Sequence, residues 1–276
     1  MIGGTQSGGR VAGPRINLVS SVSSILLAVF LVAVVALFAA DAAYVDAEAF
    51  RKALDSKPVH AAILLSVKTS TVTLFLVLIF AVPVGYALSR FRFPGKVVAE
   101  VIVDLPIVLP TIVVGVSLLV FFQTGAGRWI EGTFMRFVYT VPGIVLCQFF
   151  VSASYGIRSA KAAFDASDPR LEELALTLGC TRTQAFFRVA LPLARSGVIA
   201  GGILAWTRAV GLFSPLMILA GAVRMKTEVM PTTIYLELSV GRIDVALAVA
   251  LMMLAMAGAA LIVIHMLTSR QRRWWP

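Results

Sequence analysis

The sequence predicts an all-α integral membrane protein with six spans, and three observations support this fold class. The 276-residue chain is 59% hydrophobic and only 14% charged, whereas soluble domains carry about 25% charged residues. Its mean hydropathy is +0.93. The apolar residues also cluster in blocks long enough to cross a bilayer, which takes about 20 residues per helix.

Six apolar blocks predict the spans in chain order. They are Ser20–Ala40, Ser66–Leu88, Val101–Phe122, Val138–Ser154, Val198–Leu219 and Val245–Leu267. The third and fourth blocks contain prolines, which membrane helices tolerate when neighbouring groups satisfy the freed backbone. The first block follows two arginines and ends in small residues, so a cleaved secretory signal is an alternative to an uncleaved first span.

The distribution of lysine and arginine predicts the orientation, because cytoplasmic connections carry the excess of these residues. Of 24 such residues, fourteen fall in the N-terminal arm, the second and fourth connections and the C-terminal tail, and eight fall in the other connections. Both termini are therefore expected in the cytoplasm. The expected organisation is a cytoplasmic arm at 1–18, a transmembrane domain at 19–267 and a basic cytoplasmic tail at 268–276.

A polar segment, residues 158–197, separates the fourth and fifth predicted spans. Asp168 followed by Pro169 predicts a helix start, since aspartate caps and proline suits the first helical position. Gly179 suits the end of this helix. Its apolar residues recur at helical spacing and form one stripe; they are Leu171, Leu174, Ala175 and Leu178. The stripe is expected to pack on the chain's own spans, on the membrane interface or on a partner.

A second short helix follows in the same polar segment. Thr181 with Gln184 three residues later is a capping-box pattern, which predicts a helix N-terminus. Leu191 and Pro192 are predicted to end this helix.

The spacing of residues across this segment resembles the "EAA" loop of permease subunits in binding-protein-dependent ABC importers. The matching residues are Glu173, Ala175, Gly179, Leu191 and Pro192. Leu174 replaces the alanine at the second position of the motif, and Val189 replaces its isoleucine. Both replacements are apolar, so they alter docking detail rather than the motif's overall character.

The resemblance implies a six-span permease of the type I ABC importer kind, multi-pass in the inner (plasma) membrane. Its coupling loop, within 168–192, would dock into a separate ATPase subunit. The expected partners are that ATPase, an extracytoplasmic solute-binding protein, a second copy of the permease in a homodimer, and the lipid bilayer. The residues assigned to ATPase coupling are Leu171, Glu173, Leu174, Ala175, Leu178, Gly179, Arg182, Leu191 and Pro192.

Further segments resemble the molybdate, tungstate and sulfate branch of these permeases, and the likeness runs from about residue 60 to 267. Examples are Val82–Arg90, Asp104–Pro110 and Tyr235–Gly241. One departure concerns the fifth span, where that branch often has Gly-Glu after its arginine. Here Leu212 follows Arg208-Ala209-Val210-Gly211. The resemblance therefore favours a tetrahedral oxyanion as the transported substrate without selecting one.

Other function classes have little support in the sequence. There is no phosphate-binding loop and no catalytic or metal-ligand constellation, so no catalytic residue, metal or cofactor is expected on this chain. The net charge of +10 comes without a nucleic-acid-binding motif, and no nucleic-acid partner is expected. A stand-alone channel or secondary transporter is the alternative to an importer subunit.

Ionisable residues inside spans are candidates for a translocation pathway, because burying charge in a bilayer is costly. Lys68 lies near the start of the second span, where it either serves the pathway or extends to the interface. Arg208 lies about ten residues into the fifth span, where it needs either a buried partner or a water-filled pathway. Ser214, in the interrupted stretch Gly211–Pro215, is the third candidate.

Overall fold

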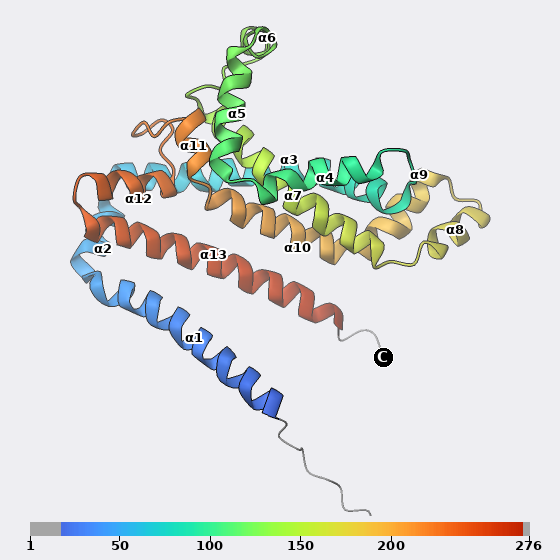
Figure 1. Cartoon of the computed structure of the whole chain (residues 1–276), viewed down its shortest axis with the longest axis horizontal. Coiled ribbons are helices and arrows are strands. Elements are labelled where there is room, and N and C mark those ends of the chain that lie inside the picture. The colour runs from blue at the N-terminus through green and yellow to red at the C-terminus, as the bar shows by residue number, and fades with distance from the viewer. Residues whose placement is uncertain (1–17, 273–276) are drawn as a thin grey trace, which may run out of the picture. The chain divides into compact units, whose positions relative to one another are not determined.

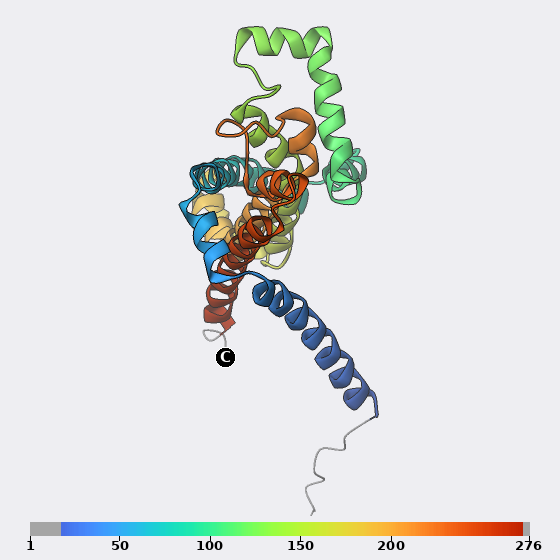
Figure 2. The same cartoon turned by 90° about the vertical axis from the view of Figure 1, so that its left-hand side faces the viewer.

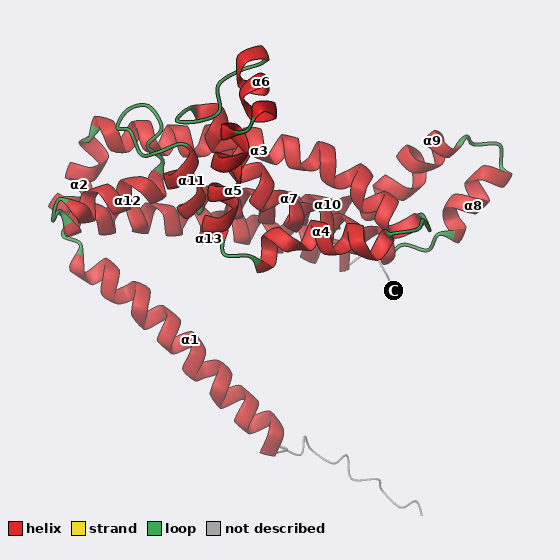
Figure 3. Cartoon of the chain, turned by 45° about the horizontal axis from the view of Figure 1, so that its top comes forward, coloured by secondary structure: helices red, strands yellow, loops and turns green. Residues whose placement is uncertain are grey.

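A computed structural model describes residues 18–272, and all regular secondary structure in this range is helical (Figure 3). The contacts divide the chain into two units, residues 1–45 and residues 46–276. The predicted arm therefore lies almost entirely outside the described residues, as does the end of the predicted tail.

The first unit contains one helix, α1 (Leu18–Tyr44), whose 27 residues include the predicted first span. At 1.5 Å per residue it is about 40 Å long, which exceeds the roughly 30 Å hydrocarbon core of a bilayer. Its large apolar side chains are exposed within this chain, for example Leu26 at 64% and Phe30 at 66%. A helix that is apolar all round suits contact with lipid or with other apolar helices.

The second unit contains the remaining helices (Figure 1). They are α2 (Ala47–Asp55), α3 (Lys57–Arg90), α4 (Lys96–Val108), α5 (Thr111–Gln123), α6 (Gly125–Thr133), α7 (Val141–Asp165), α8 (Arg170–Thr177), α9 (Arg182–Ala185), a π-helical turn (Phe186–Ala190), α10 (Leu191–Val210), α11 (Ser214–Leu219), α12 (Met230–Ser239) and α13 (Ile243–Arg272).

Five helical stretches among the described residues are long and apolar enough to cross a membrane. Four are in the second unit: α3, α7, the continuous stretch Arg182–Val210 and α13, while α1 is the fifth. The bent pair α4 and α5 makes a sixth candidate. The predicted all-α membrane fold is therefore confirmed.

The third predicted span, 101–122, is not one straight helix. α4 and α5 meet at Leu109 and Pro110 with a bend of 110°. Pro110 lacks a backbone N–H, and its ring disfavours helical geometry in the residue before it. Leu109 is accordingly extended, with ψ 143°. α5 and α6 project away from the long helices as a result (Figure 2).

The fifth predicted span, 198–219, is displaced toward the N-terminus. Leu191 and Pro192 do not end a helix, because Pro192 lies in the first turn of α10, and α10 stops at Val210. Proline is tolerated in a first turn, where its missing N–H is least needed. The π-helical turn before it, in which Leu191 N–H donates to Phe186 O, joins α9 to α10 without a break.

The long helices of the second unit pack through small residues. α3, α7 and α10 make extensive mutual contacts. A Cβ atom built on Gly201 of α10 would lie only 2.4 Å from Ser159 Cβ of α7, so only glycine permits this approach. A buried polar chain crosses the same helices: Thr73 Oγ1 donates to Gln148 Oε1 at 3.0 Å, and Gln148 Nε2 donates to Ala209 O at 3.1 Å. Close backbone approach and interhelical hydrogen bonds are the usual means of holding membrane helices together.

The two ends of this helical unit carry different structures (Figure 1). At one end, α3 and α7 terminate beside α8 and α9. At the other lie α2 and the turn from α12 to α13. α7 extends to Asp165, eleven residues beyond the predicted fourth span, so part of the predicted polar segment continues that span as a helix.

Candidate coupling site

The first short helix of the polar segment is closed at both ends by local hydrogen bonds. Asp168 Oδ1 accepts from Arg170 N–H at 2.9 Å, so the aspartate caps a helix that begins one residue later than predicted. Gly179 has φ 90° and ends the helix as predicted. Its N–H donates to Leu176 O and that of Cys180 donates to Ala175 O, both at 3.0 Å. This pairing is the Schellman motif, which favours glycine at the left-handed position.

The second short helix begins with the predicted capping box. Thr181 N–H donates to Gln184 Oε1 at 3.0 Å, and Gln184 N–H donates to Thr181 Oγ1 at 3.3 Å. Arg182 follows at the first helical position and is exposed. Two consecutive caps therefore fix the turn between α8 and α9, since each satisfies backbone groups that a short helix leaves open.

α8 shows two different faces. Glu172 and Ala175 are each 8% exposed and face the rest of the chain. The leucines of the predicted stripe point away from it: Leu171 is 44% exposed, Leu174 57% and Leu178 79%. Glu173 is also exposed. The chain thus buries one line of α8 and leaves an exposed leucine ridge, defined as Leu171, Leu174 and Leu178.

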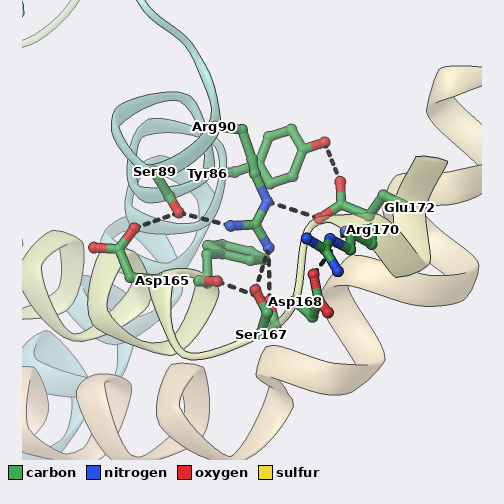
Figure 4. A network of polar contacts seen from close by, with 9 residues as sticks. Tyr86, Ser89, Arg90, Asp165, Ser167, Asp168, Arg170 and Glu172 are labelled. Atoms are coloured by element: carbon green, nitrogen blue, oxygen red, sulfur yellow. Dashed lines mark hydrogen bonds and ion pairs between the residues drawn. The ribbon is translucent and has the colours of Figure 1, made fainter.

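An ion pair attaches the buried line of α8 to the end of α3 (Figure 4). Arg90 Nε lies 2.8 Å from Glu172 Oε1, and the two side chains are only 12% and 11% exposed. Tyr86 Oη donates to the other carboxylate oxygen at 2.7 Å. Charge-assisted hydrogen bonds shielded from water are among the strongest polar contacts in a protein.

The remaining donors of Arg90 bind the segment that connects α7 to α8. Its Nη2 donates to Ser167 Oγ at 2.7 Å and to Ser167 O at 3.1 Å, and its Nη1 donates to Ser89 Oγ at 3.1 Å. Ser89 Oγ in turn donates to Asp165 at the end of α7. One guanidinium group therefore joins the end of α3, the end of α7 and the first turn of α8 (Figure 4).

Tyr86 adds aromatic contacts to this joint, by which we mean Arg90 and its partners Glu172, Ser167 and Ser89. Its ring lies 5.2 Å from that of Phe164 in α7 and 4.8 Å from that of Phe186 in the π-helical turn, both edge to face. A cleft of about 530 Å³ opens beside it. The cleft is lined by residues of α3, α8 and α9 that include Tyr86, Arg90, Glu172, Glu173, Leu176 and Arg182.

The sequence pattern singled out Glu173 in this helix, but Glu172 makes the buried contacts. One signal was available: Glu172 and Ala175 are three residues apart and can share a helix face. Ala175, a member of the predicted stripe, is buried, so the structure separates it from the three exposed leucines. Which face is buried depends on Arg90, which is 82 residues away in the chain. Among the other assigned residues, Leu191 is partly buried and Pro192 exposed.

Within residues 18–272, no hydrogen bond or ion pair links the side chains of the three pathway candidates to one another. Lys68 is exposed on α3, and Ser214 is partly buried at the start of α11. The Arg208 guanidinium lies 5.8 Å from the centre of the Tyr155 ring. Its Nε is buried without a hydrogen-bond acceptor, and Arg208 has no ion-pair partner in the described part of the chain.

Within residues 18–272, no group of three or more His, Cys, Asp or Glu side chains is arranged to hold a metal ion. Cys147 is buried, Cys180 is partly exposed, and both are free thiols.

Solved structures show the same fold at low sequence identity. An alginate ABC transporter in complex with its alginate-bound periplasmic protein matches at TM-score 0.67 and 20% identity, covering 91% of this chain and 95% of that one. The methionine transporter MetNI in an inward-facing form matches at TM-score 0.60 and 19% identity, covering 78% and 98%.

Curated relatives are similar in sequence. The molybdate/tungstate transport system permease protein WtpB of Thermococcus kodakarensis is 36% identical over 203 residues, covering 74% of this chain and 77% of its own length. The sulfate transport system permease protein CysT of Escherichia coli is 34% identical over 194 residues, covering 70% of each. The molybdenum permease ModB of Mycobacterium tuberculosis is 35% identical over 207 residues, covering 74% and 76%.

The family described as binding-protein-dependent transport system inner membrane component matches residues 81–273. That range runs from the last third of α3 past the end of α13 and includes the whole polar segment. The membrane fold, the family match and the related permeases agree. The chain therefore belongs to this family and is the permease subunit of an ABC importer.

Proposed function

We propose that this permease carries a tetrahedral oxyanion, molybdate, tungstate or sulfate, across the inner membrane. The proposal is supported by relatives at 34–36% identity that are permeases for molybdate/tungstate or sulfate. Membership of an ABC importer family removes the stand-alone channel from consideration. The chain acts as a homodimer with two ATPase subunits and an extracytoplasmic solute-binding protein.

The observation that carries the coupling role is the pair of faces on α8. Its buried line is fixed to the ends of α3 and α7 by Arg90, while the leucine ridge is exposed in this chain. Exposed leucines on a capped, rigid helix suit a groove in a partner, as in other helix-in-groove contacts. We assign that groove to the ATPase, with Glu173 and Arg182 at its edge.

The contacts of Arg90 with Glu172 and Ser167 fix α8 rigidly to the ends of α3 and α7, so α8 can transmit force to both helices. When the ATPases close, a force on α8 passes through Glu172 and Arg90 into α3 and through Ser167 into α7. Both helices pack against α10, which ends at the interruption before α11. Movement of the coupling helix is thus converted into movement of the helices that line the pathway.

Arg208 is the strongest of the proposed pathway residues. An arginine stays charged under all physiological conditions, and its buried Nε has no acceptor within the described residues. Contact with the Tyr155 ring offsets part of the desolvation cost without consuming the guanidinium donors. Those donors offer transient contacts to a passing oxyanion, and Ser214 and Lys68 extend the pathway on either side.

Reconstitution tests the transport function. Proteoliposomes that contain the permease and its ATPase, with the solute-binding protein added outside, should accumulate radiolabelled molybdate or sulfate. Uptake should require ATP in the lumen, on the side of the ATPase subunits. Competition among the three anions then ranks them. Uptake that proceeds without ATP, or that none of these anions inhibits, would refute the proposal.

Cysteine labelling tests the proposed orientation. A membrane-impermeant reagent should modify a cysteine placed at Asp46 or Met225 in intact cells, but not one placed at Gln6 or Gln271. The opposite pattern would invert the topology, and labelling at Gln6 alone would indicate a different first segment.

A further inference from the structure

Gln148 of α7 is a buried polar side chain that links α7 to two other helices. It is only 1% exposed. Its Oε1 accepts a hydrogen bond from Thr73 Oγ1 of α3 at 3.0 Å, and its Nε2 donates to Ala209 O of α10 at 3.1 Å. An amide group donates and accepts at the same time, so one side chain connects α3, α7 and α10.

The carbonyl that Gln148 binds belongs to the last turn of α10, which stops at Val210. The last four carbonyls of a helix have no donor within that helix. Leu212 N–H reaches Ala209 O at 3.3 Å, and Gln148 adds the shorter bond. Ala209 is fully buried and Leu212 is 2% exposed, so this carbonyl depends on partners inside the protein. Gln148 therefore caps the end of α10 from a different helix.

The first turn of α11 is held by the residue next to Gln148 in the chain. The thiol of Cys147 lies 3.6 Å from Pro215 O, to which it is a weak donor. On the other side, a Cβ atom built on Gly115 of α5 would lie 2.6 Å from Pro215 Cα, so the two backbones are in close contact. Leu216 is 1% exposed and packs in the same core. α7 and α5 together fix where α11 begins.

A short interruption, Gly211–Phe213, separates the two anchored helix ends. Leu212 in its centre is buried in the core cluster. Arg208 lies in the last turn of α10, next to the residue whose carbonyl is capped, and Ser214 is the first residue of α11. Two consecutive α7 side chains thus hold the two sides of the interruption, and the positions of Arg208 and Ser214 follow from them.

We propose that Gln148 is a positioning residue for anion translocation, because its cap on α10 sets the place of Arg208 relative to Ser214. This inference rests on the proposed function, in which those two residues serve the pathway. Packing alone would be met by an apolar side chain, since burying an amide carries a desolvation cost that its hydrogen bonds must offset. Without the cap, the end of α10 is free to fray or to continue past Val210, and Arg208 moves with it.

Hydrogen exchange on the complete permease–ATPase complex in nanodiscs tests the cap directly. Gln148→Met keeps the length and bulk of the side chain and removes its amide. Backbone amides in the segment 207–215 should then exchange at least about fivefold faster, because that segment opens locally. Thr73→Val is the matched control, since it removes the other hydrogen bond of Gln148 and leaves the bond to Ala209 O. The same segment should exchange at the parental rate in Thr73→Val.

The number of anions imported per ATP hydrolysed separates positioning from stability. Both variants should lower the melting temperature, since each removes a buried hydrogen bond. In proteoliposomes with the solute-binding protein and molybdate, Gln148→Met should import several-fold fewer anions per ATP, because α8 still engages the ATPase while Arg208 is displaced. Thr73→Val should keep the parental ratio. A purely structural role would reduce ATP hydrolysis and uptake together and leave the ratio unchanged.

The remaining outcomes are also decisive. Equal changes in the two variants, or parental exchange in Gln148→Met, would overturn the positioning role. If Gln148→Met does not assemble, the parental complex decides: its segment 207–215 should exchange as slowly as buried α7, and exchange as fast as the exposed turn 178–181 would refute the cap. If the parental complex imports none of the three anions, the proposed function fails, whereas the exchange rates still report whether Gln148 holds α10.

Discussion

The two ends of the second unit use the same pair of residue types for different purposes. At the coupling end, Arg90 and Glu172 are both buried, and Arg90 spends its donors on Glu172, Ser167 and Ser89. At the other end, Glu237 is buried while Arg224 and Arg242 remain half exposed. A guanidinium whose donors are satisfied inside the protein fixes helices together, whereas one that pairs with a buried carboxylate and stays half exposed keeps part of its charge accessible from outside the chain.

Removing one partner of the buried joint should have the largest effect. Glu172→Ala leaves the Arg90 charge buried and unpaired, which typically costs about 3–5 kcal/mol. We expect a lower melting temperature and loss of ATPase association in pull-down assays. Glu173→Ala is the matched control for the melting temperature, because Glu173 is the next residue and is exposed. An equal fall in melting temperature in the two variants would contradict the assignment of the buried ion pair to Glu172.

The double replacement Arg90→Met with Glu172→Leu sharpens the same point. Replacing both partners by apolar residues leaves no unpaired buried charge, so the double variant should be more stable than either single variant. ATPase-driven uptake should nevertheless stay low, because the lever from α8 to α3 is missing. Full recovery of uptake would show that the ion pair serves stability alone.

Changing the end of α8 should have the next largest effect. Gly179→Pro removes the N–H that donates to Leu176 O and cannot adopt φ 90°, at a cost of about 3 kcal/mol or more within this cap. The misdirected helix should lose ATPase association while the subunit still inserts into the membrane. Gly258→Ala inside α13, where a Cβ meets no neighbour, is the control and should leave both unchanged.

The exposed leucine ridge distinguishes docking from folding. Leu178→Asp should leave the melting temperature of the isolated subunit nearly unchanged, because Leu178 is 79% exposed. It should weaken ATPase binding by about 2 kcal/mol or more if the ridge is an anchor of that interface. Titration of the ATPase against the subunit in detergent measures this. Normal binding with Leu178→Asp would remove the ridge from the interface.

Arg208→Met tests the pathway between the two ends. The change keeps bulk and removes a charge that has no ion-pair partner in the described residues, so the melting temperature should change little. Anion uptake should fall, measured as ATP-dependent accumulation at equal complex assembly. Lost stability with normal uptake would instead mean that Arg208 has a structural partner outside the subunit.

The smallest effect is expected at Glu228, which lies beside Arg224 and Glu237 in the loop before α12. Burial raises the pKa of this carboxyl above its ordinary value, so ionisation opposes folding. The native state is therefore destabilised as pH rises from acidic values through the raised pKa. Glu228→Gln should match the parental melting temperature at acidic pH and exceed it by about 2–4 °C at pH 8. A constant difference across pH would contradict this origin.

Local chemistry was readable from the sequence. The apolar blocks predicted helices, Gly179 predicted the end of α8, and the Thr181–Gln184 pattern predicted the capping box that the structure contains. Each signal involves residues within a few positions of one another, so a single segment is enough to specify it. The membrane class and the family followed from the same local patterns.

Only the tertiary structure decided which side chains meet across the chain. Proline positions alone did not show that Pro110 breaks a span while Pro192 lies within the continuous helical stretch Arg182–Val210, because the outcome depends on the turns around them. Nor could adjacent glutamates show that Glu172 faces Arg90, 82 residues away, and that Glu173 faces outward. Burial is a property of packed neighbours, and the neighbours of these residues come from distant helices.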